Sequence, residues 1–192
     1  PPDAATADAH RSRLLEALAA VVADKGLAAT SVADVVREAG VSKRTFYEHY
    51  AGKEACFLDL YRQASASALR TLRGAVQADR PWQDQVESAL RAYFEHLAAG
   101  PRLLRTLFVD IHQLGEAGAR VRREVMSELA AFMRETVNRE RPKAQALSEA
   151  MATGAVGAIN ELVLQAIERD EQASLARLTP VASEIVRRLA QT

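Results

Sequence analysis

The chain has 192 residues, of which 48% are apolar, and its 25 Lys or Arg residues balance 25 Asp or Glu residues. A helix-forming composition of this length can bury one sizeable helical core or two small ones, and the single cysteine, Cys56, excludes an intramolecular disulfide and a cysteine-ligated metal. Because no window of about 18 residues is apolar throughout and the start lacks a basic-then-apolar signal, we expect no transmembrane span, no secretory signal and a cytoplasmic protein.

A first helix is predicted from residue 6 or 11 to Lys25, with Gly26 as its stop, and residues 1–9 are expected to be disordered. Arg11 and Arg13 lie near its start. They either reach DNA phosphates or the minor groove, or are exposed solubilising charges, and the sequence leaves both options open. The inner face of this helix carries five apolar residues, namely Leu14, Leu15, Leu18, Val21 and Val22.

A short second helix is predicted from Val32 to Ala39. Ser31 is a favourable N-cap, and Asp34 three residues on is a short variant of the capping-box acid. Gly40 supplies the left-handed residue that ends the helix in a tight turn. The turn is so short that the next helix must pack directly on this one.

A third helix begins after Ser42, which is a second N-cap, and Phe46 and Tyr50 recur at i and i+4 on its inner face. A recognition helix in the major groove of DNA presents hydrogen-bond donors from its first turn to base edges and phosphates. The outward residues of this first turn are of that kind, namely Lys43, Arg44 and Thr45.

Within this group we expect Arg44 to make the guanine contact. Tyr47 and His49 lie one turn further along, where a phenol or an imidazole suits phosphate oxygens. Lys53, at the start of the next helix, is expected to reach the DNA backbone. These three residues would fix register rather than read sequence.

The positive charge of the first part of the chain is local. Residues 1–60 hold seven Lys or Arg against nine Asp or Glu, whereas residues 42–53 hold three cations and one acid, Glu48. Nonspecific DNA affinity should therefore be weak. Binding should rely on a second copy of the domain and fall steeply with salt.

Four further helices are predicted in the middle of the chain, and every break between them has the length of a loop. Gly115 and Gly118 are expected to loosen the chain before the last of the four. Cys56 falls among apolar residues of the first, so we expect a packed thiol without a chemical role. The four ranges are 53–77, 82–98, 102–112 and 119–139.

The last two segments carry faces suited to helix packing. Residues 144–167 place Ala150, Gly154, Gly157 and Ala158 on an otherwise apolar helix. This helix and the final helix of each chain can together form a four-helix interface in a dimer, or can complete the core of the monomer. Thr179-Pro180 is either an N-cap with a first-turn proline or a kink. The final segment spaces its apolar residues by three and four, at Leu175, Leu178, Ala182, Ile185 and Leu189.

The order of residues across about 11–61 resembles the N-terminal domain of the TetR family of transcriptional regulators. The segments that carry the resemblance are Gly26-Leu27, Thr30-Ser31-Val32, Ala39-Gly40-Val41-Ser42, Phe46-Tyr47, Tyr50 and Lys53-Glu54. Many members have a small residue in place of Arg44 and a Phe in place of Tyr50, which leaves the base sequence open. The resemblance implies DNA-facing roles for Thr30, Ser31, Lys43, Arg44, Thr45, Tyr47, His49 and Lys53.

The same resemblance implies a homodimer through the last two helices. Two recognition helices about 34 to 36 Å apart would then read a palindromic operator on double-stranded DNA. A ligand between the middle helices that favours another spacing would release DNA, as is usual in this family. The direction of the response is not visible in the sequence.

Candidate residues for the effector site are aromatic, soft apolar or isolated polar residues of the middle helices. His112 and Asn160 are polar among apolar neighbours, so a ligand could provide their partner. With few aromatics and no cation cluster, we expect an apolar or weakly polar small molecule and no cofactor. The candidates are Trp82, Tyr93, Phe94, Phe108, His112, Met126, Phe132, Met133 and Asn160.

No catalytic or metal motif is visible. The chain lacks a glycine-rich phosphate loop, an HExxH motif and a nucleophile elbow, and its four histidines include no i, i+4 pair. The sequence therefore predicts a non-enzymatic, all-α protein. A three-helix helix-turn-helix domain (10–52) would precede a helical ligand-binding and dimerisation bundle (53–192). The alternative is a helical ligand-binding or adaptor protein without specific DNA binding.

Overall fold

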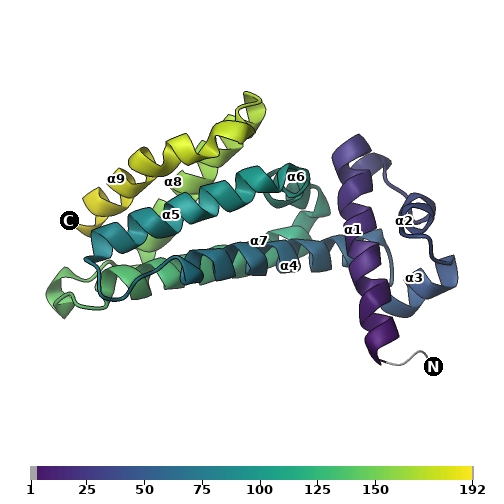
Figure 1. Cartoon of the computed structure of the whole chain (residues 1–192), viewed down its shortest axis with the longest axis horizontal. Helices are drawn as coiled ribbons and strands as arrows, with labels where there is room; N and C mark the ends of the chain where they lie inside the picture. Colours follow the sequence, from purple (N-terminus) through teal and green to yellow (C-terminus); the bar gives the residue numbers. More distant parts are fainter. Residues whose placement is uncertain (1–3, 192) are drawn as a thin grey trace. The chain divides into compact units, whose positions relative to one another are not determined.

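The structure, a computed structural model, describes residues 4–191, and every regular element in this part of the chain is helical (Figure 1). The all-α prediction is confirmed. The α-helices are α1 (Ala4–Ala29), α2 (Val32–Ala39), α3 (Lys43–His49), α4 (Lys53–Gly74), α5 (Trp82–Ala99), α6 (Pro101–Phe108), α7 (Gly115–Asn138), α8 (Glu149–Glu168) and α9 (Thr179–Ala190). Three 3₁₀ helices join them, η1 (Asp110–Leu114), η2 (Lys143–Gln145) and η3 (Gln172–Leu178).

The chain forms two compact units. Unit 1 contains the described residues of Pro1–Ala64 together with Arg102–Val121, and unit 2 contains those of Ser65–Pro101 and Arg122–Thr192. Residues from the middle of the sequence, including α6 and η1, thus fold with the first three helices. The functional division into 10–52 and 53–192 stays a prediction.

In unit 1, the core lies where α1 packs on α2 and α3 (Figure 1). Leu14, Leu18 and Val22 of α1 are fully buried, as the periodicity predicted, and they share this core with Val35 and Phe46. The expected disorder of residues 1–9 is wrong for residues 4–9, which lie in α1, and concerns residues outside the described part for 1–3. This core holds the short helices α2 and α3 in place.

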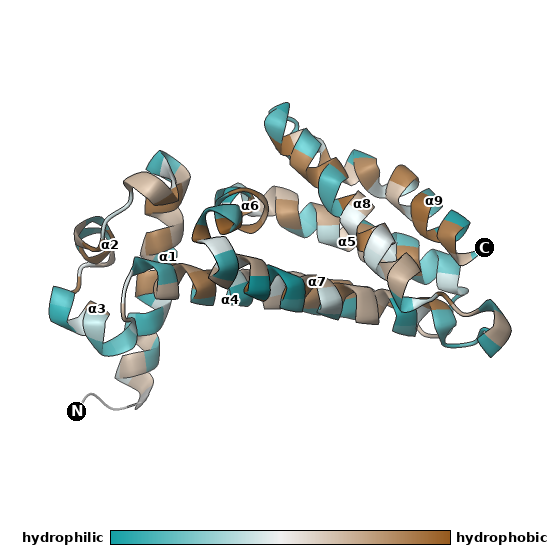
Figure 2. Ribbon diagram, turned by 180° about the vertical axis from the view of Figure 1, so that it is seen from behind, coloured by the Kyte–Doolittle hydropathy of each residue, from teal (hydrophilic) through white to brown (hydrophobic). Residues whose placement is uncertain are grey.

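In unit 2, α5 packs against η3 and α9, and α8 packs against the same two elements (Figure 1). Phe94 of α5, Val163 of α8 and Val186 of α9 are fully buried. Figure 2 shows hydrophobic residues recurring along α8 and α9. Length and composition would let Lys143–Glu168 cross a membrane. Because six residues of α8 are buried in unit 2, we interpret its apolar composition as that of a core helix.

The largest error in the predicted elements concerns Gly115 and Gly118. Instead of loosening the chain, Gly115 begins α7 with a positive φ of 54°, and Gly118 lies inside that helix. A Cβ on Gly118 would lie 2.4 Å from the carbonyl oxygen of Ile111. Glycine is therefore needed here for a close approach of η1 to α7, which the sequence pattern cannot distinguish from a flexible link.

Candidate DNA interface and effector cavity

The start of α2 is fixed by the predicted capping box. The Ser31 hydroxyl accepts a hydrogen bond from Asp34 N–H at 3.2 Å, and the Asp34 carboxylate accepts one from Ser31 N–H at 2.9 Å. The ammonium of Lys25 lies 2.6 Å from the same carboxylate. These hydrogen bonds, that of Lys25 foremost, hold the pKa of Asp34 far below its ordinary value. The carboxylate thus stays charged and holds the turn at ordinary pH.

The turn between α2 and α3 is closed by Gly40 and Arg13. Gly40 has a φ of 62°, the left-handed conformation that the sequence predicted. Arg13 donates to the carbonyl oxygens of Ala39 at 2.6 Å and Gly40 at 3.2 Å. A cation is favourable at this end of a helix, where unpaired carbonyls concentrate negative charge. Arg13 therefore has a role within the domain, which is neither of the two options that the sequence left open.

Arg11 is also held inside the domain. Its guanidinium makes two hydrogen bonds to Asp59 of α4, at 2.8 and 2.6 Å, and the hydroxyl of Tyr50 donates to the same carboxylate at 2.6 Å. Burial raises the pKa of Asp59, but these hydrogen bonds outweigh it and the pKa lies below its ordinary value. The network ties α1 and the end of α3 to α4.

The outward face of α3 carries the predicted donors in exposed positions. The Arg44 side chain is 89% exposed, and among residues 4–191 it pairs only with Glu48, at 3.1 Å. Lys43 is exposed and makes no hydrogen bond or ion pair with any described residue. Tyr47 is 57% exposed. These three side chains can reach a DNA groove without first breaking a buried contact.

The other residues of this face are more closely held. Ser31 is exposed at the N-cap of α2. Thr45 is half-buried, and its hydroxyl lies 2.9 Å from that of Ser42, whose oxygen also caps the helix. His49 is half-buried with its ring edge-on to that of His10, the centroids 6.2 Å apart. Each keeps a polar atom near the exposed face.

Lys53 and Thr30 occupy positions that the sequence did not predict. The Lys53 ammonium donates to the carbonyl oxygens of Leu27 at 3.0 Å and Thr30 at 2.8 Å. Thr30 is 2% exposed, and its hydroxyl donates to the carbonyl of Gly26 at 2.7 Å. Gly26 breaks the helical geometry of α1, which frees these carbonyls. Both side chains are therefore engaged in joining α1 to α2 and α4.

Replacing Lys53 with Met is expected to destabilise unit 1 by about 2 kcal/mol, because carbonyls bonded to a cation lose their donor while the apolar stem is kept. Chemical denaturation followed by circular dichroism measures this. Lys143→Met, at an exposed lysine, is the matched control and should change stability by no more than about 0.5 kcal/mol. Equal stability of the two variants would show that Lys53 does not hold the junction.

The same junction is contacted by a buried carboxylate from the middle of the sequence. Asp110 of η1 is fully buried and accepts hydrogen bonds from Gln113 at 2.9 Å and from the backbone N–H of Leu27. Arg105 of α6 lies 3.4 Å from it. Burial is the dominant effect and raises the pKa of Asp110 above its ordinary value, although these contacts oppose it. Asp110 thus links α6 and η1 to the end of α1.

Asp110 and Asp59 should respond to pH with opposite signs. A raised pKa means that the folded state binds the proton more tightly, so the contribution of Asp110 to stability falls as pH rises above its ordinary pKa of 3.8. Asp59, with a lowered pKa, contributes stability that is lost as pH falls below 3.8. Relative to the parent chain, Asp110→Asn should gain stability with rising pH and Asp59→Asn should lose it.

Urea unfolding of the three proteins between about pH 3 and 6 measures both slopes. Each variant is the control for the other, since both remove one aspartate from unit 1. If stability changed with pH in the same direction for both variants, the opposite pKa shifts assigned to Asp110 and Asp59 would be contradicted.

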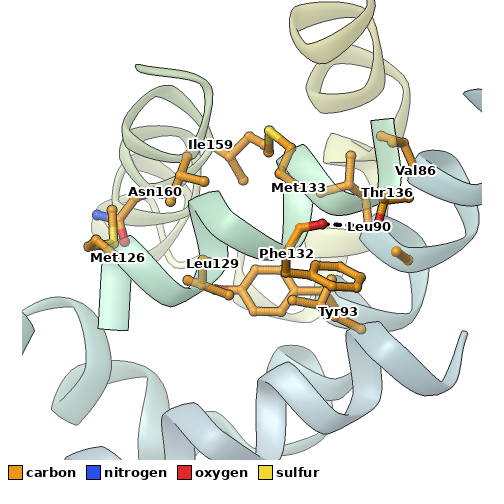
Figure 3. A pocket seen from close by; sticks show the side chains of 13 residues that line it. Val86, Leu90, Tyr93, Met126, Leu129, Phe132, Met133, Thr136, Ile159 and Asn160 are labelled. Atoms are coloured by element: carbon orange, nitrogen blue, oxygen red, sulfur yellow. Dashed lines mark hydrogen bonds between the residues drawn. The ribbon is translucent and has the colours of Figure 1, made fainter. Parts of the chain in front are cut away.

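Unit 2 contains a largely apolar cavity lined by α4, α5, α7 and α8 (Figure 3). Its free volume is about 60 Å³, which is far below the roughly 300 to 1,000 Å³ of typical ligand pockets. The hydroxyl of Thr136 donates to the carbonyl of Phe132, leaving the amide of Asn160 as a polar group without a described partner. Five predicted effector residues line the cavity, namely Tyr93, Met126, Phe132, Met133 and Asn160.

Four predicted effector residues do not line this cavity. Phe94 is fully buried in the core of unit 2, and Trp82 stacks under the guanidinium of Arg141 at 5.4 Å. Phe108 and His112 belong to unit 1, where Phe108 is buried and His112 is exposed. Apolar spacing places a residue in a core but does not show which core. Leu90, Leu129 and Ile159 line the cavity and were missed because they match ordinary core residues.

The predicted packing faces of the last two helices divide between core and surface. Leu175 and Ala182 are fully buried within unit 2, so part of the predicted seam completes the core. Ile185 and Leu189 are half-buried, and Val181 beside them is 44% exposed. On α8, Ala150, Gly154 and Gly157 are exposed. The proline at Thr179-Pro180 lies in the first turn of α9, and not at a kink inside a longer α-helix.

Comparison with known proteins gives consistent matches. Residues 14–60 match the model of a family described as bacterial regulatory proteins, tetR family. The HTH-type transcriptional repressor KstR2 of Rhodococcus jostii is 30% identical over 154 residues, which cover 66% of this chain and 76% of that protein. The HTH-type transcriptional activator FasR of Mycolicibacterium smegmatis is 28% identical over 100 residues, covering 50% of this chain and 46% of that protein.

Solved structures match almost the whole chain. The fatty acid degradation regulator FadR of Bacillus halodurans has a TM-score of 0.82 at 18% identity, with 92% of this chain and 94% of that chain covered. FadR of Bacillus subtilis in complex with stearoyl-CoA has a TM-score of 0.77 at 16% identity, covering 91% and 96%. These likenesses show a shared fold.

Proposed function

The chain belongs to the TetR family of bacterial regulatory proteins, and from this premise we propose that it represses transcription as a homodimer on a palindromic operator and is released by a small-molecule effector. It is a DNA-binding transcriptional regulator. The observation that carries the proposal is the first turn of α3, where exposed Lys43 and Arg44 are held by the Ser42 cap and the buried Phe46.

The proposed DNA surface consists of the outward side chains of α3 and the start of α2. Arg44 reads a base edge, because a guanidinium can donate two hydrogen bonds to guanine. The remaining side chains position the domain on phosphates. Lys53 and Thr30 support this surface from inside through the junction at Gly26 and take no part in contact. The surface is formed by Ser31, Lys43, Arg44, Thr45, Tyr47 and His49.

The proposed dimer forms through the outward faces of α8 and α9. Nothing lies within 4 Å of a Cβ built on Gly154, so a partner helix can approach this face closely. Val181, Ile185 and Leu189 add apolar area on α9. Two recognition helices at a spacing of about 34 to 36 Å then fit one turn of DNA, which supports a palindromic operator.

The proposed effector carries a long acyl chain that enters the cavity of unit 2. The support is the largely apolar lining and the shared fold with a regulator that was solved in complex with stearoyl-CoA. Because the cavity holds only about 60 Å³, entry must move side chains such as Met126 and Met133, whose unbranched thioethers adapt readily. A ligand that favours the opened form shifts the equilibrium between conformations.

The connectivity of the chain supports a way in which ligand binding in the cavity affects the DNA surface. Helices α5 and α7 line the cavity, and α6 and η1 are the segment between them. Asp110 in that segment binds the backbone of Leu27 at the end of α1. Movement of α5 or α7 is thereby coupled to the junction that holds α2.

We further propose a cytoplasmic location and no enzymatic activity.

Selection of binding sites from a random duplex pool tests the function. We expect an enriched palindrome that the Lys43→Ala, Arg44→Ala, Tyr47→Ala triple variant loses. The control variant, Lys143→Ala, Arg169→Ala, Arg177→Ala, removes three exposed side chains from unit 2. It should still enrich the same palindrome. Arg44→Ala alone should cost about 1 to 3 kcal/mol on the enriched site and relax one base position.

No enrichment, or enrichment that the triple variant retains, would overturn the proposed DNA surface. A helical ligand-binding or adaptor protein would then be the better description. Addition of stearoyl-CoA to the protein bound to its selected duplex tests release. Retention of DNA at saturating ligand would contradict the proposed effector response while leaving the DNA surface intact.

A further inference from the structure

A groove between α7 and α8 gathers three arginines beside the cavity, with which it shares Met126. It has a volume of about 470 Å³. Arg122 and Arg123 are adjacent on α7, Arg134 lies about three turns further along the same helix, and Thr153 and Gly157 of α8 also line the groove. The lining also includes Ala130 and Ala131, so the groove combines small side chains with cationic ones.

The cations of this groove are incompletely paired. Arg122 and Arg123 make no hydrogen bond or ion pair with the residues that the structure describes. Arg134 lies 3.8 Å from Glu149, and its Nε is buried without a hydrogen-bond partner in the described part of the chain. Glu149 is the one acid of the lining, which leaves two positive charges uncompensated. A buried donor without an acceptor is costly, so an anionic ligand oxygen here would be stabilising.

Met126 lines both the cavity and the groove. In Figure 3, Met126 and Asn160 lie together at one end of the cavity. The flexible thioether of Met126 is thus shared by an apolar compartment and a cationic one. A molecule whose apolar chain and phosphate-bearing head are joined by a spacer can place each part in the matching compartment when this side chain moves.

We infer that the groove of Arg122, Arg123 and Arg134 binds the phosphate groups of an effector whose acyl chain fills the cavity. This inference rests on the proposed function, which places the acyl chain. Arginine is suited to the head because its planar guanidinium binds two phosphate oxygens at once. The ligand class is thus a phosphate-bearing acyl amphiphile, either an acyl-CoA thioester or a lysophospholipid. A fatty acid carries one carboxylate directly on its acyl chain, without a spacer to reach the groove, so it would make fewer of these contacts.

Calorimetric titration of the full chain tests the inference with stearoyl-CoA, stearoyl lysophosphatidate and stearate as probes. In the Arg122→Ala, Arg123→Ala variant we expect the Kd for at least one phosphate-bearing probe to rise about 10- to 100-fold. The Kd for stearate should change by less than about threefold, since its carboxylate lies directly at the end of the chain that fills the cavity. Comparison of the first two probes identifies which head the groove prefers.

The matched control is Arg169→Ala, Arg177→Ala, which removes the same charge from exposed arginines of unit 2. It should leave all three Kd values within about threefold. Circular dichroism checks that each variant folds. Arg122→Lys, Arg123→Lys, which keeps the charge and loses the paired donors, should fall between the parent chain and the alanine variant.

Equal Kd changes for stearate and the phosphate-bearing probes, or equal effects of the control, would overturn the groove as a phosphate site. Binding of stearate alone to the parent chain would also overturn it, while supporting an acyl chain in the cavity. Binding of none of the probes would refute the acyl effector of the proposed function, and this inference with it.

Discussion

Phe46→Ala is expected to destabilise unit 1 by about 3 to 5 kcal/mol, which is enough to unfold the helix-turn-helix at ordinary temperature. Phe46 is fully buried at the inner face of α3. Its ring packs against Tyr50 with the centroids 5.8 Å apart. Truncation leaves a cavity beneath a helix of seven residues, which is too short to persist without its core contact. Thermal unfolding followed by circular dichroism measures the loss.

The neighbouring aromatic provides the control. Tyr47 is 57% exposed, so Tyr47→Ala should change stability by about 0.5 kcal/mol or less. It should instead weaken binding to all duplexes by roughly tenfold, as expected for the loss of a phosphate contact. A stable Phe46→Ala variant, or an unstable Tyr47→Ala variant, would reverse the assigned inner and outer faces of α3.

Gly154→Glu is expected to convert the proposed dimer to a monomer and to weaken operator binding at least about a hundredfold. The side chain has open space around it, so the monomer tolerates it. In the proposed interface the carboxylate would be buried against a partner helix without a cation. Loss of the second DNA-binding domain then removes the avidity that two linked half-sites provide, which is typically 10²- to 10⁴-fold. Sedimentation and operator titration measure the two effects.

Gly74→Glu is the matched substitution. Gly74 is exposed at the end of α4, and a Cβ there also contacts nothing within 4 Å. This variant should remain dimeric with unchanged operator affinity. A dimeric Gly154→Glu variant would exclude the outward face of α8 as the interface and would redirect attention to α9.

The DNA-binding helices could be predicted because their signals are local. Ser31 and Gly40 each act within four residues of their own position, and α2 begins and ends where the sequence predicts. The same holds for the Ser42 cap and for the inward Phe46. Such contacts depend on backbone geometry that is already fixed by sequence spacing.

The roles of Lys53 and Asp110 could not be predicted in this way. Lys53 binds carbonyls 23 and 26 residues away, and Asp110 binds the backbone of Leu27. Their partners become available only because Gly26 breaks α1, and no periodic pattern carries that information. In a sequence, a lysine or aspartate that binds the backbone of its own chain looks the same as one that is exposed to solvent. Long-range pairing alone distinguishes a structural cation from one that faces a ligand.

The candidate effector site could be predicted only in part. Periodicity identified soft apolar side chains such as Met126 and Met133, which line the cavity. It also selected Phe108 and His112, which fold with unit 1 because the chain returns to α1 after α5. Whether an apolar residue faces this cavity depends on how four helices meet, and helical spacing describes only one helix at a time.

The assignment of Arg102–Val121 to unit 1 has a practical consequence for building chimaeric regulators. A DNA-reading head transplanted by one cut near Lys53 would leave behind the carboxylate that occupies the Leu27 amide. Such hybrids should recognise their operator yet respond poorly to effector. Moving α6 and η1 together with α1–α3, through three cuts instead of one, keeps the head and its internal contact as a single transferable module.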